Sequence, residues 1–257
     1  MANLYSAGAG IRYLEQLADR DSPVHRITAA AKIITTVVYI VLVVSFSRTN
    51  VSGLIPYIFY PVLLMAVSQT PYLPLIKRMA AALPFALFGG IANLFFDKDV
   101  AFLIASVPVT YGMISCTSIF IKTFLTVAAV LILISTTPLT DISDWFVRVK
   151  VPPIFVLSLM MTYRYISVLL DEAAAMYTAY LLRSVSARGV KIRNMGVFIG
   201  QLLLRSIDRA ERIYFAMKCR GFNALYRPAA EIKLKPADFA YITCVCGILL
   251  VLRFVNI

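Results

Sequence analysis

Five apolar runs, each close to the length that crosses a lipid bilayer, constrain this sequence more than any other feature. They occupy residues 28–46, 51–69, 80–96, 112–135 and 237–256. A helix needs about 20 mostly apolar residues to span the hydrocarbon layer, so each run can cross the membrane once. The apolar content of 60% exceeds what a soluble domain carries. The sequence therefore predicts an all-α membrane protein with about five transmembrane helices.

The positive charges predict which segments face the cytoplasm. The segment up to Lys32, the loop 70–79 and residues 141–235 carry all but four of the 25 Lys and Arg. Cytoplasmic segments beside membrane helices are enriched in these residues, so we expect a cytoplasmic N-terminus and an external C-terminus. Because topology accounts for the net charge of +12, nucleic acid is not an expected partner.

This plan divides the chain into three parts. Residues 1–140 form an N-terminal membrane domain with four spans, residues 141–235 a cytoplasmic domain, and residues 236–257 a C-terminal transmembrane helix. Residues 70–79 are predicted to be a loop. Residues 100–112 are too short to cross as a helix, so we expect an extended surface segment there.

The stretch from Pro152 to Phe222 differs from the rest, because it is apolar yet repeatedly carries Arg. It has no internal Gly or Pro from Pro153 to Arg183, so one helix of about 30 residues is possible. A second helix is expected from about Asn194 to Arg220, with Gly221 as a left-handed residue just beyond its end. Both are predicted to be long amphipathic helices on the cytoplasmic side. The second has one apolar stripe, formed by Ile199, Leu203, Ile207, Ala210, Tyr214 and Met217.

The Arg residues at the ends of these two helices allow two interpretations. Arg183 and Arg220 can simply complement the helix dipoles, a stabilisation of roughly 0.3–1 kcal/mol each. Alternatively, each guanidinium projects as a planar, charged fork into an acidic groove of another protein. The residues themselves leave both open.

Three runs of residues resemble a known family. They are STTP, YRYISVLLDEAAAMYTAYLLRS and LLLRSIDRAERIYFAMKCRGF, all within 134–222. They resemble the transmembrane T component of energy-coupling-factor (ECF) type ABC importers, most closely its cobalt-importer branch. In that family two X-Arg-X motifs, often Ala-Arg-Gly, end two coupling helices that dock on a pair of ATPase subunits.

The resemblance implies which residues dock here. The second motif falls on Cys219, Arg220 and Gly221, with Cys in place of Ala. The family spacing places the first on Leu182, Arg183 and Ser184. By its letters alone, the triplet five residues later is a secondary candidate, formed by Ala187, Arg188 and Gly189.

The resemblance implies a non-catalytic scaffold of an ATP-driven importer in a bacterial or archaeal cytoplasmic membrane. It would transmit the motion of two ATP-binding-cassette subunits to a separate substrate-binding membrane (S) subunit. The implied substrate is cobalt or another divalent metal, with a vitamin-type scaffold as an alternative. The chain itself has no GxxxxGK[ST] phosphate-binding loop, so we expect ATP to be hydrolysed by the partners and no cofactor to be bound here.

Two other classes of function compete with this one. The single histidine, His25, has no ligand cluster near it in the sequence, so no metal site is expected. No nucleophile or acid–base pair assembles for an enzyme acting on lipid head groups. A conventional permease that carries substrate itself would depend on Lys122, the one charge within the fourth span, which can equally serve a structural role.

Overall fold

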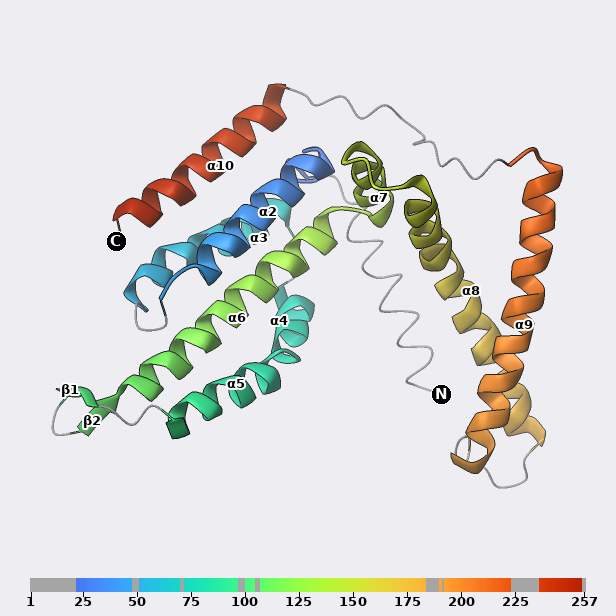
Figure 1. Cartoon of the computed structure of the whole chain (residues 1–257), viewed down its shortest axis with the longest axis horizontal. Coiled ribbons are helices and arrows are strands. Elements are labelled where there is room, and N and C mark those ends of the chain that lie inside the picture. The colour runs from blue at the N-terminus through green and yellow to red at the C-terminus, as the bar shows by residue number, and fades with distance from the viewer. Residues whose placement is uncertain are drawn as a thin grey trace. The chain divides into compact units, whose positions relative to one another are not determined.

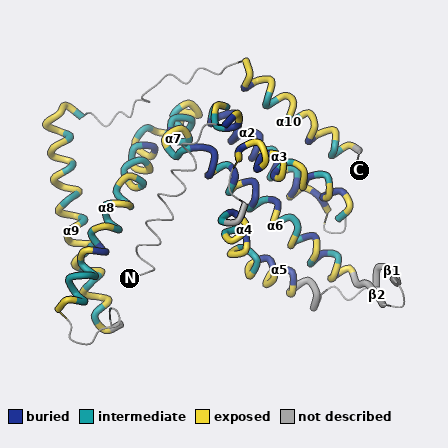
Figure 2. The backbone as a smooth tube through the Cα atoms, turned by 180° about the vertical axis from the view of Figure 1, so that it is seen from behind, coloured by how far each residue is buried: buried dark blue, intermediate teal, exposed yellow. Residues whose placement is uncertain are grey.

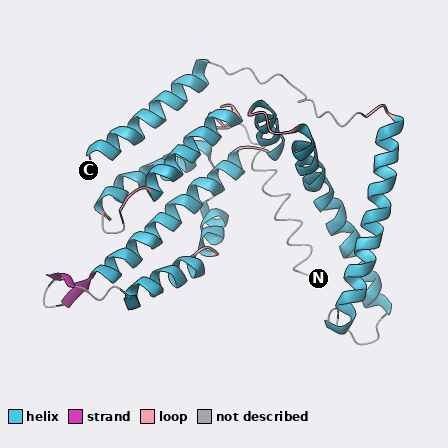
Figure 3. Ribbon diagram, in the orientation of Figure 1, coloured by secondary structure: helices cyan, strands magenta, loops and turns pink. Residues whose placement is uncertain are grey.

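The computed structural model describes residues 22–47, 51–69, 72–96, 100–104, 107–183, 190, 192–222 and 236–255. Its elements follow the chain in the order α2 (Ala29–Val44), η1 (Ser52–Ile58), α3 (Phe59–Ser68), α4 (Tyr72–Ala80), α5 (Leu83–Phe96), β1 (Val100–Ile104), β2 (Val107–Thr110), α6 (Tyr111–Thr136), α7 (Leu139–Arg148), α8 (Pro153–Arg183), α9 (Ile192–Cys219) and α10 (Pro236–Val255). Helices dominate the described residues (Figures 1 and 3). The predicted all-α membrane architecture is confirmed.

The only strands in the described part of the chain form one short antiparallel hairpin. β1 pairs with β2 between α5 and α6 (Figure 3). This is the segment for which the sequence predicted an extended conformation, and that prediction is confirmed.

The helices form two compact units. The bundle unit contains α2, η1, α3, α4, α5, α6 and α10. The long-helix unit contains α7, α8 and α9. Each unit is described by itself below.

Helix α6 is the centre of the bundle unit. It packs against α2, α3, α4 and α5, and Figure 1 shows it running between α2 and α3 on one side and α4 and α5 on the other. Its inward residues are small or apolar, with Leu125, Ala128, Ala129 and Ile132 all buried. At 26 residues it is long enough to cross the bilayer completely.

Two lysines show that α6 runs antiparallel to α2. Lys32, near the start of α2, donates a hydrogen bond to the carbonyl oxygen of Thr136 at the end of α6, at 2.8 Å. Lys122, in the first half of α6, donates to the carbonyl oxygen of Phe46 beyond the end of α2, at 2.6 Å. In each case an ammonium group satisfies a carbonyl that its own helix leaves unpaired.

Two contacts show that α10 runs parallel to α2. The backbone N–H of Thr28, just before α2, donates to the Asp238 carboxylate near the start of α10, at 3.1 Å. At the other end, Arg253 of α10 donates to the Ser45 carbonyl at 3.3 Å, and its guanidinium lies 4.1 Å from the ring centre of Phe46. Helix α10 therefore caps α2 at both ends.

The turn between α3 and α4 lies at the same side of the bundle as the end of α6. One buried cluster joins them, formed by Val24, Leu64, Met65, Leu75, Met79, Ala128 and Ile132. The starts of α2 and α10 lie on this side as well. The chain therefore traverses the bundle five times in alternating directions, through α2, η1 with α3, α4 with α5, α6, and α10.

Length and apolar composition select a slightly different set of candidate spans. They pick out Pro74–Ile91, Tyr111–Thr136, Pro153–Arg183 and Pro236–Phe254, while α2 and η1 with α3 are shorter apolar helices. The first and second predicted spans are therefore short but pack within the bundle. Helix α8 qualifies because its first ten residues carry no charge, although Arg164, Asp171, Glu172 and Arg183 follow. The placement of α8 at the cytoplasmic surface stays a prediction.

The predicted loop 70–79 is wrong for most of its length, because α4 covers Tyr72–Ala80. Pro74 lies in the first turn, where its missing N–H is not needed for the helical hydrogen bonds. Leu75 and Met79, four residues apart on one face, are both buried. Burial of this face, together with a tolerated proline, turns an apparent loop into a helix.

Tyrosine hydroxyls join three elements in the core of the bundle. Tyr39 of α2 donates to the carbonyl of Tyr57 in η1 at 2.9 Å, and Tyr57 donates to the carbonyl of Leu249 in α10 at 2.9 Å. Both side chains are fully buried. Because the bilayer interior offers no water, each such bond satisfies a buried hydroxyl that would otherwise lack a partner.

Close approach of α5 and α6 depends on one of two adjacent glycines. A Cβ atom on Gly90 would lie 2.6 Å from the sulfur of Cys116, whereas a Cβ on Gly89 would meet nothing within 4 Å. Gly90 therefore permits the close approach of α5 and α6, whereas Gly89 is not required for it.

In the long-helix unit, a tight turn joins α7 to α8. Lys150 has a left-handed backbone with φ of 63°. The N–H of Val151 donates to the carbonyl of Phe146 at 3.1 Å, which closes the end of α7. Helix α8 then begins at Pro153, a position where proline is favoured.

Candidate functional site

Helix α8 has the bounds predicted for the first long helix. It begins at Pro153 and ends at Arg183. Leu182 and Arg183 are exposed, Leu182 to 83%. The end of α8 therefore presents an apolar residue and a cation beside each other.

Helix α9 ends in a motif that fixes the direction of its last residues. The N–H of Phe222 donates to the carbonyl of Met217 at 3.1 Å, and the N–H of Gly221 donates to the carbonyl of Lys218 at 2.9 Å. This pair of bonds is the Schellman motif, which needs a left-handed residue at the position of Gly221. Gly221 has φ of 76°, so the predicted role of Gly221 is confirmed.

Arg220 is the residue between the last helical residue, Cys219, and this glycine. Cys219, Arg220 and Gly221 are all exposed. The Arg220 side chain thus leaves the chain where the helix has just ended and where the following turn is rigidly defined. Such a position can present a guanidinium to a partner with little loss of backbone entropy.

The first predicted triplet is only partly within the described residues. Leu182 and Arg183 are described, whereas Ser184, Ala187, Arg188 and Gly189 lie outside the described residues. The bounds of α8, which run to Arg183, agree with the helix predicted from Pro153 to Arg183. The choice between Arg183 and Arg188 stays a prediction.

A carboxylate joins α8 to α9. Glu172 accepts from Arg205 with one oxygen and from Arg209, at 3.0 Å, with the other. Arg205 and Arg209 are four residues apart and therefore lie on one face of α9. Glu172 therefore forms salt bridges with two cations of α9.

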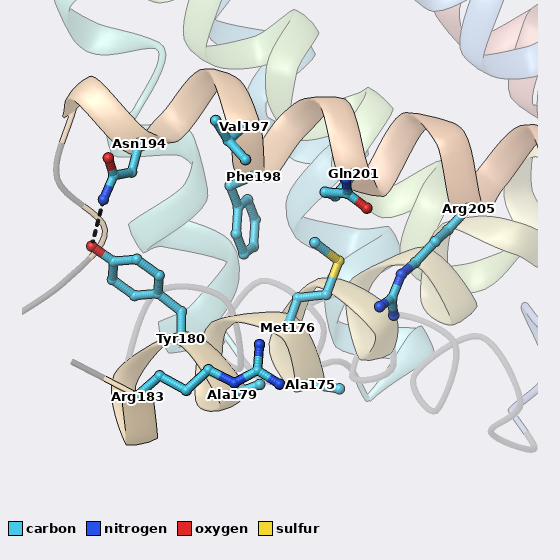
Figure 4. Close-up of a pocket in the computed structure, with 10 residues that line it drawn as sticks. All are labelled: Ala175, Met176, Ala179, Tyr180, Arg183, Asn194, Val197, Phe198, Gln201 and Arg205. Carbon is cyan, nitrogen blue, oxygen red and sulfur yellow. Dashed lines mark hydrogen bonds between the residues drawn. The ribbon is translucent and has the colours of Figure 1, made fainter.

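A second polar contact joins the two helices nearer to the end of α8. Asn194, in the first turn of α9, donates to the hydroxyl of Tyr180 at 3.1 Å (Figure 4). Together with the Glu172 contacts, this bond shows that α8 and α9 pair in antiparallel directions. The facing sides of α8 and α9 are marked by two residue pairs, Glu172 with Arg205 and Tyr180 with Asn194.

A cavity of about 810 Å³ lies between these two contacts. It is lined by Ala175, Met176, Ala179, Tyr180, Arg183, Asn194, Val197, Phe198, Gln201 and Arg205. Figure 4 shows Arg183 extending back along α8 toward Ala179. In this arrangement the guanidinium lies at the cavity wall, still exposed to a partner.

The apolar stripe predicted for α9 is only partly in contact with α8. Its members Ala210 and Met217 line a cavity together with residues of α8. Ile199, Leu203, Ile207 and Tyr214 are each between 48% and 58% exposed. The side of α9 that meets α8 also carries Asn194, Phe198, Gln201, Arg205 and Arg209. An apolar stripe of this extent is a surface that needs lipid or a protein partner.

Sequence reasoning missed the role of Arg205 and Arg209 in holding the helices together, and it missed the cavity. The one available signal was their spacing of four residues, which places two cations on a single helical face. Their partner could not be found from the sequence, because Glu172 is 33 residues from Arg205.

The residues considered for metal binding or substrate passage have structural contacts. His25 pairs through Nδ1 with the Ser22 hydroxyl at 2.7 Å. Within the described ranges, no group of three or more His, Cys, Asp or Glu side chains comes together. Lys122 donates to the Phe46 carbonyl, as given above, which supports the structural interpretation of that charge.

Comparison with known proteins identifies the family. The model of the family CbiQ, cobalt transport protein, matches residues 20–231. An uncharacterised protein of Methanocaldococcus jannaschii is 28% identical over 243 residues, covering 88% of this chain and 81% of that protein.

Two relatives with named functions match over shorter stretches. The cobalt transport protein CbiQ of Rhodobacter capsulatus is 34% identical over 96 residues, which are 37% of this chain and 39% of that protein. The nickel permease LarQ of Lactiplantibacillus plantarum is 30% identical over 91 residues, which are 35% of this chain and 33% of that protein. Because the family match covers most of the sequence, the chain belongs to the CbiQ family of cobalt transport proteins, the T components of ECF-type importers that its sequence resembles.

Proposed function

We propose that this protein is the membrane scaffold of an ECF-type importer, and that α8 and α9 couple it to two ATP-hydrolysing subunits. ATP binding and hydrolysis move the ATPase subunits, the two Arg-bearing helix ends follow, and the motion reorients a separate substrate-binding membrane subunit. The scaffold itself is non-catalytic and lies in a bacterial or archaeal cytoplasmic membrane with its N-terminus in the cytoplasm.

The observation that carries this proposal is the geometry at the end of α9. Arg220 is exposed immediately before a left-handed glycine, at the end of a helix with an exposed apolar stripe. Helix-dipole compensation alone would require neither the exposed stripe nor a rigid turn directly after the Arg. A guanidinium beside apolar surface is well suited to an acidic groove on another protein.

The proposed substrate is cobalt or another divalent metal, such as nickel. The family match and the two named relatives support this class over a vitamin. Selection of the metal is assigned to the substrate-binding subunit, because the sequence of this chain offers a single histidine and no cluster of ligands.

A conventional permease is less well supported. Its best residue, Lys122, is engaged by the end of α2. The scaffold function therefore explains the long-helix unit without requiring a substrate pathway through this chain.

The test is ATP-dependent uptake of radioactive cobalt by the assembled complex with Arg183→Ala and Arg220→Ala combined. We expect uptake to fall to background, together with loss of ATPase subunits from the purified complex. Arg212→Ala is the matched control, because Arg212 is an exposed Arg on α9. Full uptake and normal assembly of the double variant would refute the proposed docking residues.

A further inference from the structure

One of the polar contacts between α8 and α9 depends on a single carboxylate of α8. Glu172 uses both oxygens, one on Arg205 and the other on Arg209. Its side chain is 23% exposed, against 56% and 36% for the two Arg side chains. The carboxylate is thus the more buried partner, enclosed by two cations one helical turn apart.

Apolar packing does not hold α9 in place on α8. From 193 to 222, none of the side chains that the structure describes is buried, and Figure 2 shows α9 in the colours of exposed and intermediate residues throughout its described length. A helix pair with an interdigitated core would have its crossing angle fixed by ridges and grooves. Here that constraint is weak, so the polar contacts determine the geometry.

Cavities flank the Glu172 contact on both sides. The larger one, of about 810 Å³, extends toward Asn194 and the end of α8. A smaller one, of about 250 Å³, extends the other way and is lined by Met161, Tyr165, Leu169, Ser206, Arg209, Ala210, Ile213 and Met217. The two helices therefore leave unfilled space beside the Glu172 contact in both directions along their length.

We propose that Glu172 is a positioning residue that acts as a charged pivot between α8 and α9. The carboxylate fixes the point at which the helices cross, while the unfilled space on either side lets the angle between them change. Such a change breaks no packed core, because α9 contributes no buried side chain to one in its described part.

A change in the angle at Glu172 would move the two proposed docking residues, Arg183 and Arg220, relative to each other. This step rests on the function proposed above. Arg183 lies 11 residues beyond Glu172 on α8, and Arg220 lies 11 residues beyond Arg209 on α9. At about 1.5 Å per residue, each arm is on the order of 16 Å long. A change in crossing angle therefore redirects Arg220 relative to α8, while the Tyr180 to Asn194 bond restrains the other end.

The crossing angle can be measured by pulsed electron paramagnetic resonance on the purified full-length chain. Spin labels are attached to the native, exposed Cys219 and to Ser158→Cys, an exposed position on the opposite arm of α8. The other cysteines, Cys116, Cys244 and Cys246, are replaced by Ser. We expect a single main distance in the parent and a shifted or broadened distribution in Glu172→Gln.

A charge-exchange variant distinguishes loss of the Glu172 contact from a general destabilisation of the protein. Glu172→Arg combined with Arg205→Glu and Arg209→Glu restores opposite charges across the contact, and we expect it to recover the parental distance distribution. Glu211→Gln, which removes an exposed carboxylate from α9, is the matched control and should leave the distribution unchanged. A parental distribution in Glu172→Gln, or a charge exchange that fails to restore it, would overturn the inference.

Uptake by the assembled complex then tests the pivot in transport. We expect Glu172→Gln to lose uptake while retaining its ATPase subunits, and the charge exchange to recover uptake. An altered distance distribution with parental uptake would also overturn the positioning role. The distance measurement needs no ATPase, so it can succeed or fail independently of the docking experiment with Arg183 and Arg220.

Discussion

Lys122 of α6 donates a hydrogen bond to the carbonyl oxygen of Phe46, at 2.6 Å, and so places a positive charge at the end of α2. The contact shows how an ionisable group within a predicted span is accommodated. The ammonium group meets a carbonyl that no helical N–H can reach, and each group satisfies the other.

Replacing Lys122 by Met should lower the stability of the protein without abolishing uptake. The substitution keeps the length of the side chain but leaves the Phe46 carbonyl without this donor, at a cost of about 1–3 kcal/mol. The melting temperature of the detergent-solubilised chain measures this, and Lys122→Arg, which keeps a donor, serves as the control. Loss of cobalt uptake with unchanged melting would instead favour a substrate pathway through this chain.

Replacing Tyr57 by Phe should destabilise the bundle unit by about 1–2 kcal/mol. The change removes only the hydroxyl that donates to the Leu249 carbonyl, so a buried hydrogen bond between η1 and α10 is lost. Thermal unfolding of the variant is compared with Tyr111→Phe, an exposed tyrosine at the start of α6. Equal melting temperatures for the two variants would contradict the importance of this bond.

Adjacent glycines of α5 should respond differently to the same substitution. Gly90→Leu places atoms where the Cys116 sulfur lies, so we expect overpacking to cost about 1–3 kcal/mol. Gly89→Leu meets open space and should be neutral or slightly stabilising. Thermal unfolding of both variants checks the contrast, and a larger loss at Gly89 would show that the α5–α6 contact is assigned to the wrong glycine.

Replacing Lys150 by Gly should stabilise the turn between α7 and α8. A left-handed backbone costs a residue with a side chain roughly 1 kcal/mol more than glycine. Lys150→Ala separates strain from charge, because it removes the ammonium group but keeps the Cβ atom. We expect a higher melting temperature for Lys150→Gly only, and an equal gain in both variants would assign the effect to charge.

Local sequence signals predicted the long helices well. The absence of Gly and Pro after Pro153 gave the bounds of α8, and Gly221 was placed correctly because a left-handed residue ends many helices. Periodicity also found the apolar stripe of α9. It could not show which residues of the stripe are exposed and which line the cavity beside α8, because the facing residues are determined by contacts between distant parts of the chain.

The predictions that were wrong or missing concern features that depend on tertiary contacts. Residues 72–80 contain Pro74, Lys77 and Arg78, which reduce local hydrophobicity, yet burial of one face against the bundle makes them helical. The pairing of Glu172 with Arg205 and Arg209 likewise depends on a crossing that no local pattern encodes. Sequence periodicity predicts elements, whereas partners across 33 residues or more require the tertiary structure.

The double capping of α2 by α10 has a consequence for how the protein is made. Thr28 and Ser45 receive their partners from Asp238 and Arg253, which are 210 and 208 residues further along the chain. Helix α2 is therefore synthesised long before the groups that complete its two ends exist. Loss of α10 would leave both ends of α2 without these partners.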